Sequence, residues 1–146
     1  MPPLAKMQAI PQIRTLTMAD MLLDTRLIKD YRTGDSGAGD IIQQVMEGMI
    51  TASVSSLTVF ELLRSTKSDR RAEVGYVGIL SFLEIAPLTA AAAKLAGVWM
   101  ASSTENEQHD LEQFSLIAAT AKERGEAICT RNAEAFGKFE VEIVEY

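Results

Sequence analysis

The sequence predicts an α/β protein of three layers, α/β/α, in which helices cover both faces of a mostly parallel central sheet. Short apolar segments of the buried-strand type alternate with segments of helical periodicity along most of the 146 residues. This alternation is typical of βαβ units, whose crossover helices return the chain to the same edge of the sheet. Two of the predicted strands also run directly into helix-start signals.

The first strand is predicted at MLLD, 21–24, a short apolar run. Asp24 ends this run and begins a helix pattern that stops at Gly34. Residues 1–20, ahead of the strand, lack sustained periodicity and contain three prolines. We therefore expect an N-terminal extension over 1–20 and a single domain over 21–146, which is long enough to bury a core.

A second strand and its following helix are predicted next. Residues 40–49 carry apolar side chains at helical spacing, and the β-branched residues of 50–56 indicate a strand. Thr58 and Glu61 match the S/T-x-x-E capping box that opens a helix. We therefore expect the strand to pass into a helix near residues 55–58.

The second half of the chain continues the alternation. Its strongest helix pattern is 110–125, where apolar positions recur at spacings of three and four residues before Gly125. The other predicted segments are, in order, helix 71–82, strand 82–88, helix 89–102, strand 127–130, a helical turn at 132–136 and strand 141–146.

The composition indicates the redox environment of the protein and whether it contacts a membrane. The single cysteine, Cys129, cannot form an internal disulfide and lies in an apolar segment, which indicates a reducing, cytoplasmic environment. The segment most like a membrane span is 83–101, but it carries Glu84, Pro87 and Lys94. We therefore expect no membrane contact.

The net charge of −6 argues against binding of nucleic acid by general electrostatic attraction, because that binding depends on lysine and arginine neutralising phosphates. It does not exclude a local basic strip. Residues 64–71 hold four of the fourteen basic residues: Arg64, Lys67, Arg70 and Arg71. A solvated helix end explains such a run, and a contact for phosphates or for a partner is the alternative.

Acid and amide side chains follow the predicted strands at one edge of the sheet. In an open parallel sheet, chemistry collects at the carboxyl ends of the strands, where the following helices present their N-termini. The residues placed there are Asp24, Glu61, Asp110 and Asn132. Helix capping explains each of them singly, but their convergence from four separate segments indicates a site.

A cluster of oxygen ligands without histidine or thiolate partners suits Mg²⁺ or Mn²⁺. Such ions position a phosphodiester and lower the pKa of a bound water so that it can attack the phosphorus in line. The pattern of acids therefore predicts nuclease chemistry.

The chain resembles the PIN-domain ribonucleases, and most closely the VapC-type toxins of prokaryotic toxin–antitoxin modules, over about residues 21–146. The matching segments are MLLDTRLIKDY at 21–31, SVSSLTVFELLRS at 53–65, FLEIAPL at 82–88, SLIAATAKERG at 115–125 and CTRNAEAF at 129–136. Their order and spacing together make the resemblance specific. It implies a PIN-like α/β/α fold, Mg²⁺- or Mn²⁺-dependent cleavage of RNA, a small cognate antitoxin that occludes the site, and a homodimer.

The resemblance also assigns residues. Asp24 matches the first acid, Glu61 the glutamate of an E-L-L motif, and Asn132 the last position of a T-x-D/N motif. The third acid is normally an aspartate two residues before the L-I-A-A run, and that position is Phe114 here. Asp110 lies four residues earlier on the same helical face and is a candidate substitute.

Two hypotheses follow from these residues. In the first, the protein is a toxin-type endoribonuclease in which Asp24, Glu61 and Asp110 bind Mg²⁺ or Mn²⁺ and Asn132 is a polar auxiliary. In the second, a PIN-like module has lost catalysis and serves in binding or assembly. The loss of the third acid favours the second hypothesis. So does Arg26, which stands where the family usually carries a small polar residue and which we expect to pair with Asp24 or Glu61 if the cluster is neutralised without metal.

Overall fold

The sheet has five strands, all parallel, in the order β3-β2-β1-β4-β5. The strands are β1 (Asp20–Leu23), β2 (Thr51–Ser55), β3 (Glu84–Ala86), β4 (Ala127–Thr130) and β5 (Ile143–Glu145). The computed structural model describes residues 20–103 and 108–146, without the side chains of 108–110. The predicted parallel α/β sheet is confirmed, whereas the extension predicted at 1–20 lies outside the described residues except for its last position.

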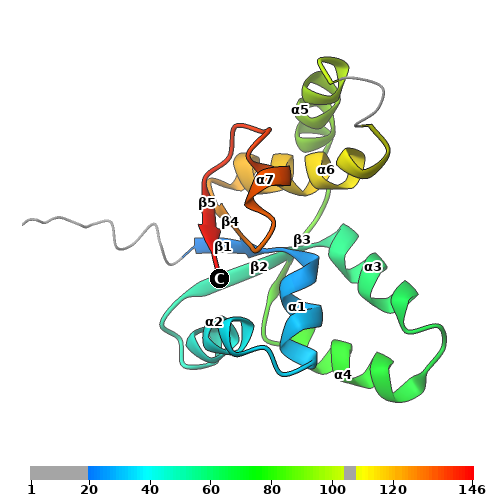
Figure 1. Ribbon diagram of the computed structural model, residues 1–146, viewed down its shortest axis with the longest axis vertical. Helices are drawn as coiled ribbons and strands as arrows, with labels where there is room; N and C mark the ends of the chain where they lie inside the picture. Colours follow the sequence, from blue (N-terminus) through cyan, green and yellow to red (C-terminus); the bar gives the residue numbers. More distant parts are fainter. Residues whose placement is uncertain (1–19, 104–107) are drawn as a thin grey trace, which may run out of the picture.

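Helices cover both faces of this sheet, so the predicted three layers are present (Figure 1). One face is covered by α1 (Thr25–Arg32), α2 (Ser36–Met46), α3 (Ser56–Ser65) and α4 (Arg70–Leu80). The other face is covered by α6 (Gln108–Arg124) and α7 (Ala133–Phe136), and α5 (Ala90–Ala101) packs against α6 (Figure 1). None of the described helices is long and apolar enough to cross a membrane.

The core is divided by the sheet into two apolar clusters. Met21 and Leu23 of β1 face the side of α1 to α4, and Leu22 faces the side of α6 and α7. All three side chains are buried, because a parallel strand between two helical layers has no solvated face. The continuous apolar run at the first strand is the signature of this environment.

The start of α3 differs from the prediction. Ser55, the last residue of β2, is the N-cap, and its hydroxyl accepts a hydrogen bond from the Leu57 backbone amide at 3.0 Å. Thr58 is buried inside the helix, with its Oγ1 2.7 Å from Oγ1 of Thr25. The predicted capping box at Thr58 and Glu61 is therefore wrong, because Ser55 caps the helix and Thr58 lies inside it, whereas the predicted passage from strand to helix near residues 55–58 is confirmed.

The ends of other helices and strands also differ from the prediction. The helix predicted at 40–49 begins at Ser36 because the Asp35 carboxylate caps it, accepting from the Ala38 amide at 2.9 Å. The strand predicted at 82–88 is reduced to the three residues of β3. Gly34 and Gly125 follow α1 and α6 with positive φ, as predicted for helix ends.

Candidate active site

The parallel pairing of β1 and β4 brings Asp24 beside Thr130. Leu23 is in register with Cys129, and the Asp24 amide donates to the Cys129 carbonyl at 3.0 Å. The Thr130 hydroxyl then donates to Oδ2 of Asp24 at 2.8 Å, and accepts from the Asn132 amide at 2.9 Å. Residues 106 positions apart in the sequence are thus joined at the carboxyl edge of the sheet.

Asp24 is a buried carboxyl group, with 3% of its surface exposed. Asp24 is the residue that precedes α1, but its side chain makes no capping hydrogen bond to the helix. Burial raises the pKa of Asp24, because the charged form loses solvation, while the Thr130 hydroxyl and the amides of Thr25 and Arg26 oppose this rise. A strongly buried acid in a cavity wall is a functional-site candidate on physical grounds.

The Asp24 pocket has a volume of about 380 Å³ and is lined by Asp24, Arg26, Phe114, Arg131 and Asn132. Phe114 occupies the position where the resemblance implies a third acid. Its ring makes an edge-to-face contact with Phe136, with centroids 5.1 Å apart, as part of the core beneath α6 and α7. The lining of the pocket thus combines an apolar ring with a buried carboxyl group.

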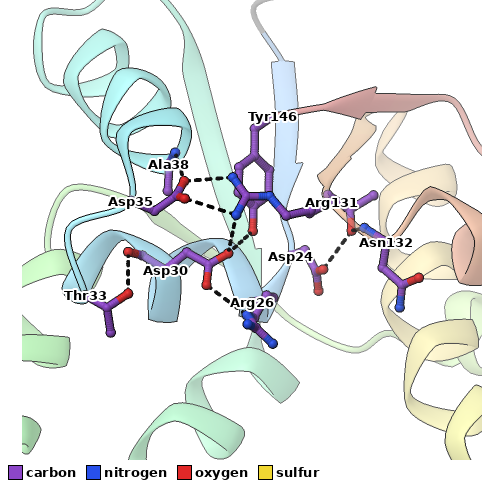
Figure 2. A network of polar contacts seen from close by, with 10 residues as sticks. Asp24, Arg26, Asp30, Thr33, Asp35, Ala38, Arg131, Asn132 and Tyr146 are labelled. Carbon is purple, nitrogen blue, oxygen red and sulfur yellow. Dashed lines mark hydrogen bonds and ion pairs between the residues drawn. The ribbon is translucent and has the colours of Figure 1, made fainter.

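The two arginines at this pocket pair with acids that lie outside its lining (Figure 2). Arg26 donates from Nε to Asp30 at 2.8 Å. Arg131 makes two hydrogen bonds to Asp35, at 2.8 and 3.1 Å, and a longer one to Asp30 at 3.4 Å. The neutralisation expected of Arg26 therefore falls on Asp30, and in the structure neither arginine bridges Asp24 to Glu61.

Tyr146 completes this network from the end of β5. Its hydroxyl donates to Asp30 at 2.8 Å, and the Arg131 guanidinium lies 4.4 Å from its ring centroid (Figure 2). Burial disfavours the ionised form of Asp30, but hydrogen bonds from Arg26 and Tyr146 outweigh it and lower the pKa of Asp30. Arg131 holds the pKa of Asp35 at about 2.

Sequence reasoning missed this network. The spacing of Arg26 and Asp30, four residues apart on a helix, is a signal that was available. No local pattern connects Arg131 with Asp35 or Tyr146 with Asp30, because these pairs are 96 and 116 residues apart.

Glu61 lies in a different cavity. The Glu61 groove, of about 230 Å³, is lined by Leu57, Phe60, Glu61, Glu112, Gln113 and Leu116. The Arg64 guanidinium binds both oxygens of Glu61, at 2.6 and 2.7 Å, and lowers the pKa of Glu61 against a smaller opposing effect of burial. Asp24 and Glu61 thus stand at the same edge of the sheet in separate surroundings.

The remaining two predicted site residues have different outcomes. Asn132 lines the Asp24 pocket, and its Oδ1 accepts a weak 3.4 Å hydrogen bond from the Ala135 amide, so it also caps α7. Asp110 belongs to the first turn of α6, but its side chain lies outside the described residues. Its part in a metal site stays a prediction.

The described side chains do not by themselves fit a divalent cation of the kind that the resemblance implies. No three acid, histidine or cysteine side chains among residues 20–103 and 111–146 are grouped so that they could hold an ion. Asp24 supplies a single carboxylate to its pocket, and Glu61 is engaged by Arg64. Mg²⁺ is held by one or two protein carboxylates together with several waters, and the Phe114 ring adds no carboxylate to the one that Asp24 supplies.

Solved structures share this fold, although no protein-family model and no curated protein matches the sequence. A chain of FitAcB from Neisseria gonorrhoeae superposes with a TM-score of 0.69 at 19% identity, over 84% of this chain and 95% of that one. A chain of DNA-bound VapBC from Salmonella typhimurium gives 0.66 at 21%, over 88% and 98%. A toxin–antitoxin complex from Klebsiella pneumoniae gives 0.64 at 20%, over 85% and 95%. At these identities the similarity establishes the fold, and it is the fold that the PIN-domain resemblance implied.

Proposed function

We propose that this protein is the PIN-like toxin component of a toxin–antitoxin module and that it cleaves RNA as an endoribonuclease. The observation that carries the proposal is the fold, which is shared over 84–88% of the chain with solved structures of toxin–antitoxin, VapBC and FitAB complexes. The placement of Asp24 in a pocket at the carboxyl edge of the sheet supports it. Fold alone does not determine function, so the proposal needs its own test.

The proposed cofactor is Mg²⁺ or Mn²⁺, with Asp24, Glu61 and Asp110 as ligands and Asn132 as a polar auxiliary. A shared ion would require the Glu61 carboxylate to leave Arg64 and to reach the Asp24 pocket. When bound, such an ion supplies an activated water and neutralises charge on a phosphodiester. The chain's own contribution is clearest at Asp24, whose Oδ2 is oriented by the Thr130 hydroxyl. Asn132 presents a side-chain amide to the same pocket.

The test combines metal binding with RNA cleavage. Mn²⁺ is titrated calorimetrically into the wild-type protein, Asp24→Asn and Asp40→Asn, the last being an exposed acid of α2 that serves as a matched control. Each protein is then incubated with a generic RNA and Mn²⁺. We expect binding and cleavage by the wild type and by Asp40→Asn, and loss of both in Asp24→Asn. Wild-type protein that leaves RNA intact would contradict the ribonuclease proposal.

A second candidate function is a PIN-like binding or assembly module without catalysis. The Phe114 ring in the Asp24 pocket and the incomplete acid set among the described residues favour it specifically. The same experiment separates the two candidates. A wild-type chain that neither binds Mn²⁺ nor cleaves RNA, yet retains a cognate partner protein, has the second function.

The partners are part of the first proposal. We propose a small cognate antitoxin that covers the site, a homodimer, and a cytoplasmic location where RNA is available. Expression of the chain alone in bacteria should arrest growth, and Asp24→Asn should not. Sedimentation equilibrium of the purified chain tests the homodimer.

A further inference from the structure

The outer surface of α3 and of the turn into α4 combines an exposed aromatic ring with a concentration of positive charge. We define this α3–α4 surface as Phe60, Arg64, Lys67, Arg70 and Arg71. Phe60 is 61% exposed, and the four basic residues are exposed as well. Residues 61–73, which include the acids that pair with Arg64 and Arg70, contain four basic and three acidic side chains, in a chain that has 14 basic and 20 acidic residues in all. The surface therefore has the opposite charge balance to the protein as a whole.

Much of this positive charge is available to a ligand. Lys67 and Arg71 have no acidic partner within 4.0 Å in the described part of the chain, and the Arg70–Glu73 pair is long, at 3.7 Å, and solvated. The one acid within the strip, Asp69, accepts from the Arg71 and Ala72 amides at the start of α4. Its charge is thus directed at the helix N-terminus rather than at the basic side chains.

The aromatic ring stands next to the candidate site. Phe60 and Glu61 line the same groove, with Leu116 of α6 opposite. The Arg64 guanidinium, which binds Glu61, also lies 5.7 Å from the Phe60 ring centroid. Figure 1 shows the turn between α3 and α4 at the outer end of both helices, so the surface extends from the groove outward.

We propose that the α3–α4 surface binds single-stranded RNA, with an unpaired base stacked on Phe60 and the phosphates beside Lys67, Arg70 and Arg71. The proposal rests on the proposed function, because it takes RNA as the ligand of the same molecule. An exposed aromatic ring flanked by cations is the arrangement that binds single strands, since each base offers a π-face and each nucleotide a phosphate. Duplex RNA is a poorer fit, because its bases are already stacked on one another.

The experiment measures binding without catalysis. A short fluorescein-labelled single-stranded RNA is titrated in EDTA, by fluorescence anisotropy, from about 50 to about 200 mM KCl. The charge variant is Lys67→Asn with Arg71→Ala; asparagine is chosen because Lys67 has a φ of +51°, which asparagine tolerates. Its control, Lys94→Ala with Lys122→Ala, removes two exposed lysines of α5 and α6. The aromatic variant is Phe60→Ala, with Phe82→Ala, 57% exposed, as control.

The expected results are quantitative. Phe60→Ala should weaken binding by about 5- to 150-fold, the range found for loss of one stacked base. The charge variant should reduce the slope of log affinity against log salt by about 1.4, because each of the two phosphates that it leaves without a cation accounts for about 0.7. Both control variants should match the wild type in affinity and slope. All four sets of substitutions are at exposed positions, and an unchanged circular dichroism melt confirms that each variant is folded.

The outcomes separate this inference from the ribonuclease proposal. If RNA binding depends on the α3–α4 surface but RNA is not cleaved in Mn²⁺, the surface inference is supported and the ribonuclease proposal is contradicted. If RNA is cleaved but its binding is unchanged in the surface variants, the ribonuclease proposal is supported and the surface inference is contradicted. Equal binding of polyglutamate would overturn the inference in favour of an acidic protein partner. So would a Phe60→Ala variant that only converts a dimer to a monomer.

Discussion

The Asp24 pocket and the Glu61 groove lie at the same edge of one sheet, yet they shift the pKa values of their carboxyl groups in opposite directions. Asp24 is buried, and burial raises its pKa although the hydrogen bond from the Thr130 hydroxyl opposes the rise. Glu61 is bound by a guanidinium, so its pKa is lowered. The difference shows that a position at the carboxyl edge does not define an acid's chemistry. The neighbours supplied by distant segments define it.

The two phenylalanines offer the largest contrast. Phe114 packs edge-to-face on Phe136, whereas Phe60 is largely exposed. We expect Phe114→Ala to lower the free energy of unfolding by about 2–3 kcal/mol, less than for a fully buried ring because Phe114 is half-buried. Phe60→Ala should change it by less than about 0.5 kcal/mol. Urea unfolding of both variants is the measurement, and equal effects would contradict a stabilising contact between Phe114 and Phe136.

A carboxylate at position 114 should increase the affinity of the Asp24 pocket for divalent cations. Phe114→Asp places a second acid beside Asp24, and we expect it to raise Mn²⁺ affinity at least about tenfold, or about 1.4 kcal/mol. Val98→Asp, at a 67% exposed position of α5, adds the same charge as a control. Calorimetric titration measures both. Unchanged affinity in Phe114→Asp would mean that the missing third acid is not what limits metal binding.

The Thr130 hydroxyl donates a hydrogen bond to Asp24, so its removal should affect Asp24 but leave Glu61 unchanged. Thr130→Val removes the hydrogen bond to Asp24 while keeping the side-chain shape, and we expect a decrease of about 1–2 kcal/mol in stability. The pKa of Asp24 should rise further, because the hydrogen bond that favours its charged form is removed. The pKa of Glu61 should stay unchanged. Carbon-13 NMR titration of the side-chain carboxyls reports both groups, and a parallel shift of Glu61 would indicate a general disturbance instead.

The opposite pKa shifts of Asp24 and Glu61 predict that their contributions to stability depend on pH with opposite signs. Of the effects predicted here, these are the smallest. As pH rises from the ordinary value of 3.8 through the raised pKa of Asp24, the folded state keeps a proton that the unfolded chain releases, so stability falls. The Glu61 contribution is present above its ordinary value of 4.5 and is lost as pH falls through the lowered pKa.

Two amide variants test these signs. The stability of Asp24→Asn relative to the wild type should increase with pH across the first window. That of Glu61→Gln should decrease with rising pH across the second, by a small amount because its partner Arg64 is exposed to solvent. Urea midpoints measured over the acid range give both slopes. Slopes of the same sign would contradict the contrast between the two cavities.

Part of this arrangement could be read from local patterns. The buried-strand run before Asp24 and the glycine helix ends were correct, because strand burial and helix termination depend on a few neighbouring residues. The capping box at Thr58 was not, since Ser55 caps α3 and the Thr58 hydroxyl is instead beside that of Thr25, a residue of another helix. The cap at Asp35 and the ion pairs of Arg131 were missed for a related reason. Their partners are selected by tertiary contact.

The sequence by itself determined the order of strands and helices, their layers and the presence of Asp24 and Asn132 at the edge of the sheet. These features follow from periodicity, which acts over one or two helical turns. Only the tertiary structure decided that Asp24 and Glu61 face separate cavities, that Phe114 walls one of them, and that Tyr146 joins Asp30 across 116 residues. Side-chain partners depend on strand register and on which helices abut, and neither is encoded in any single segment.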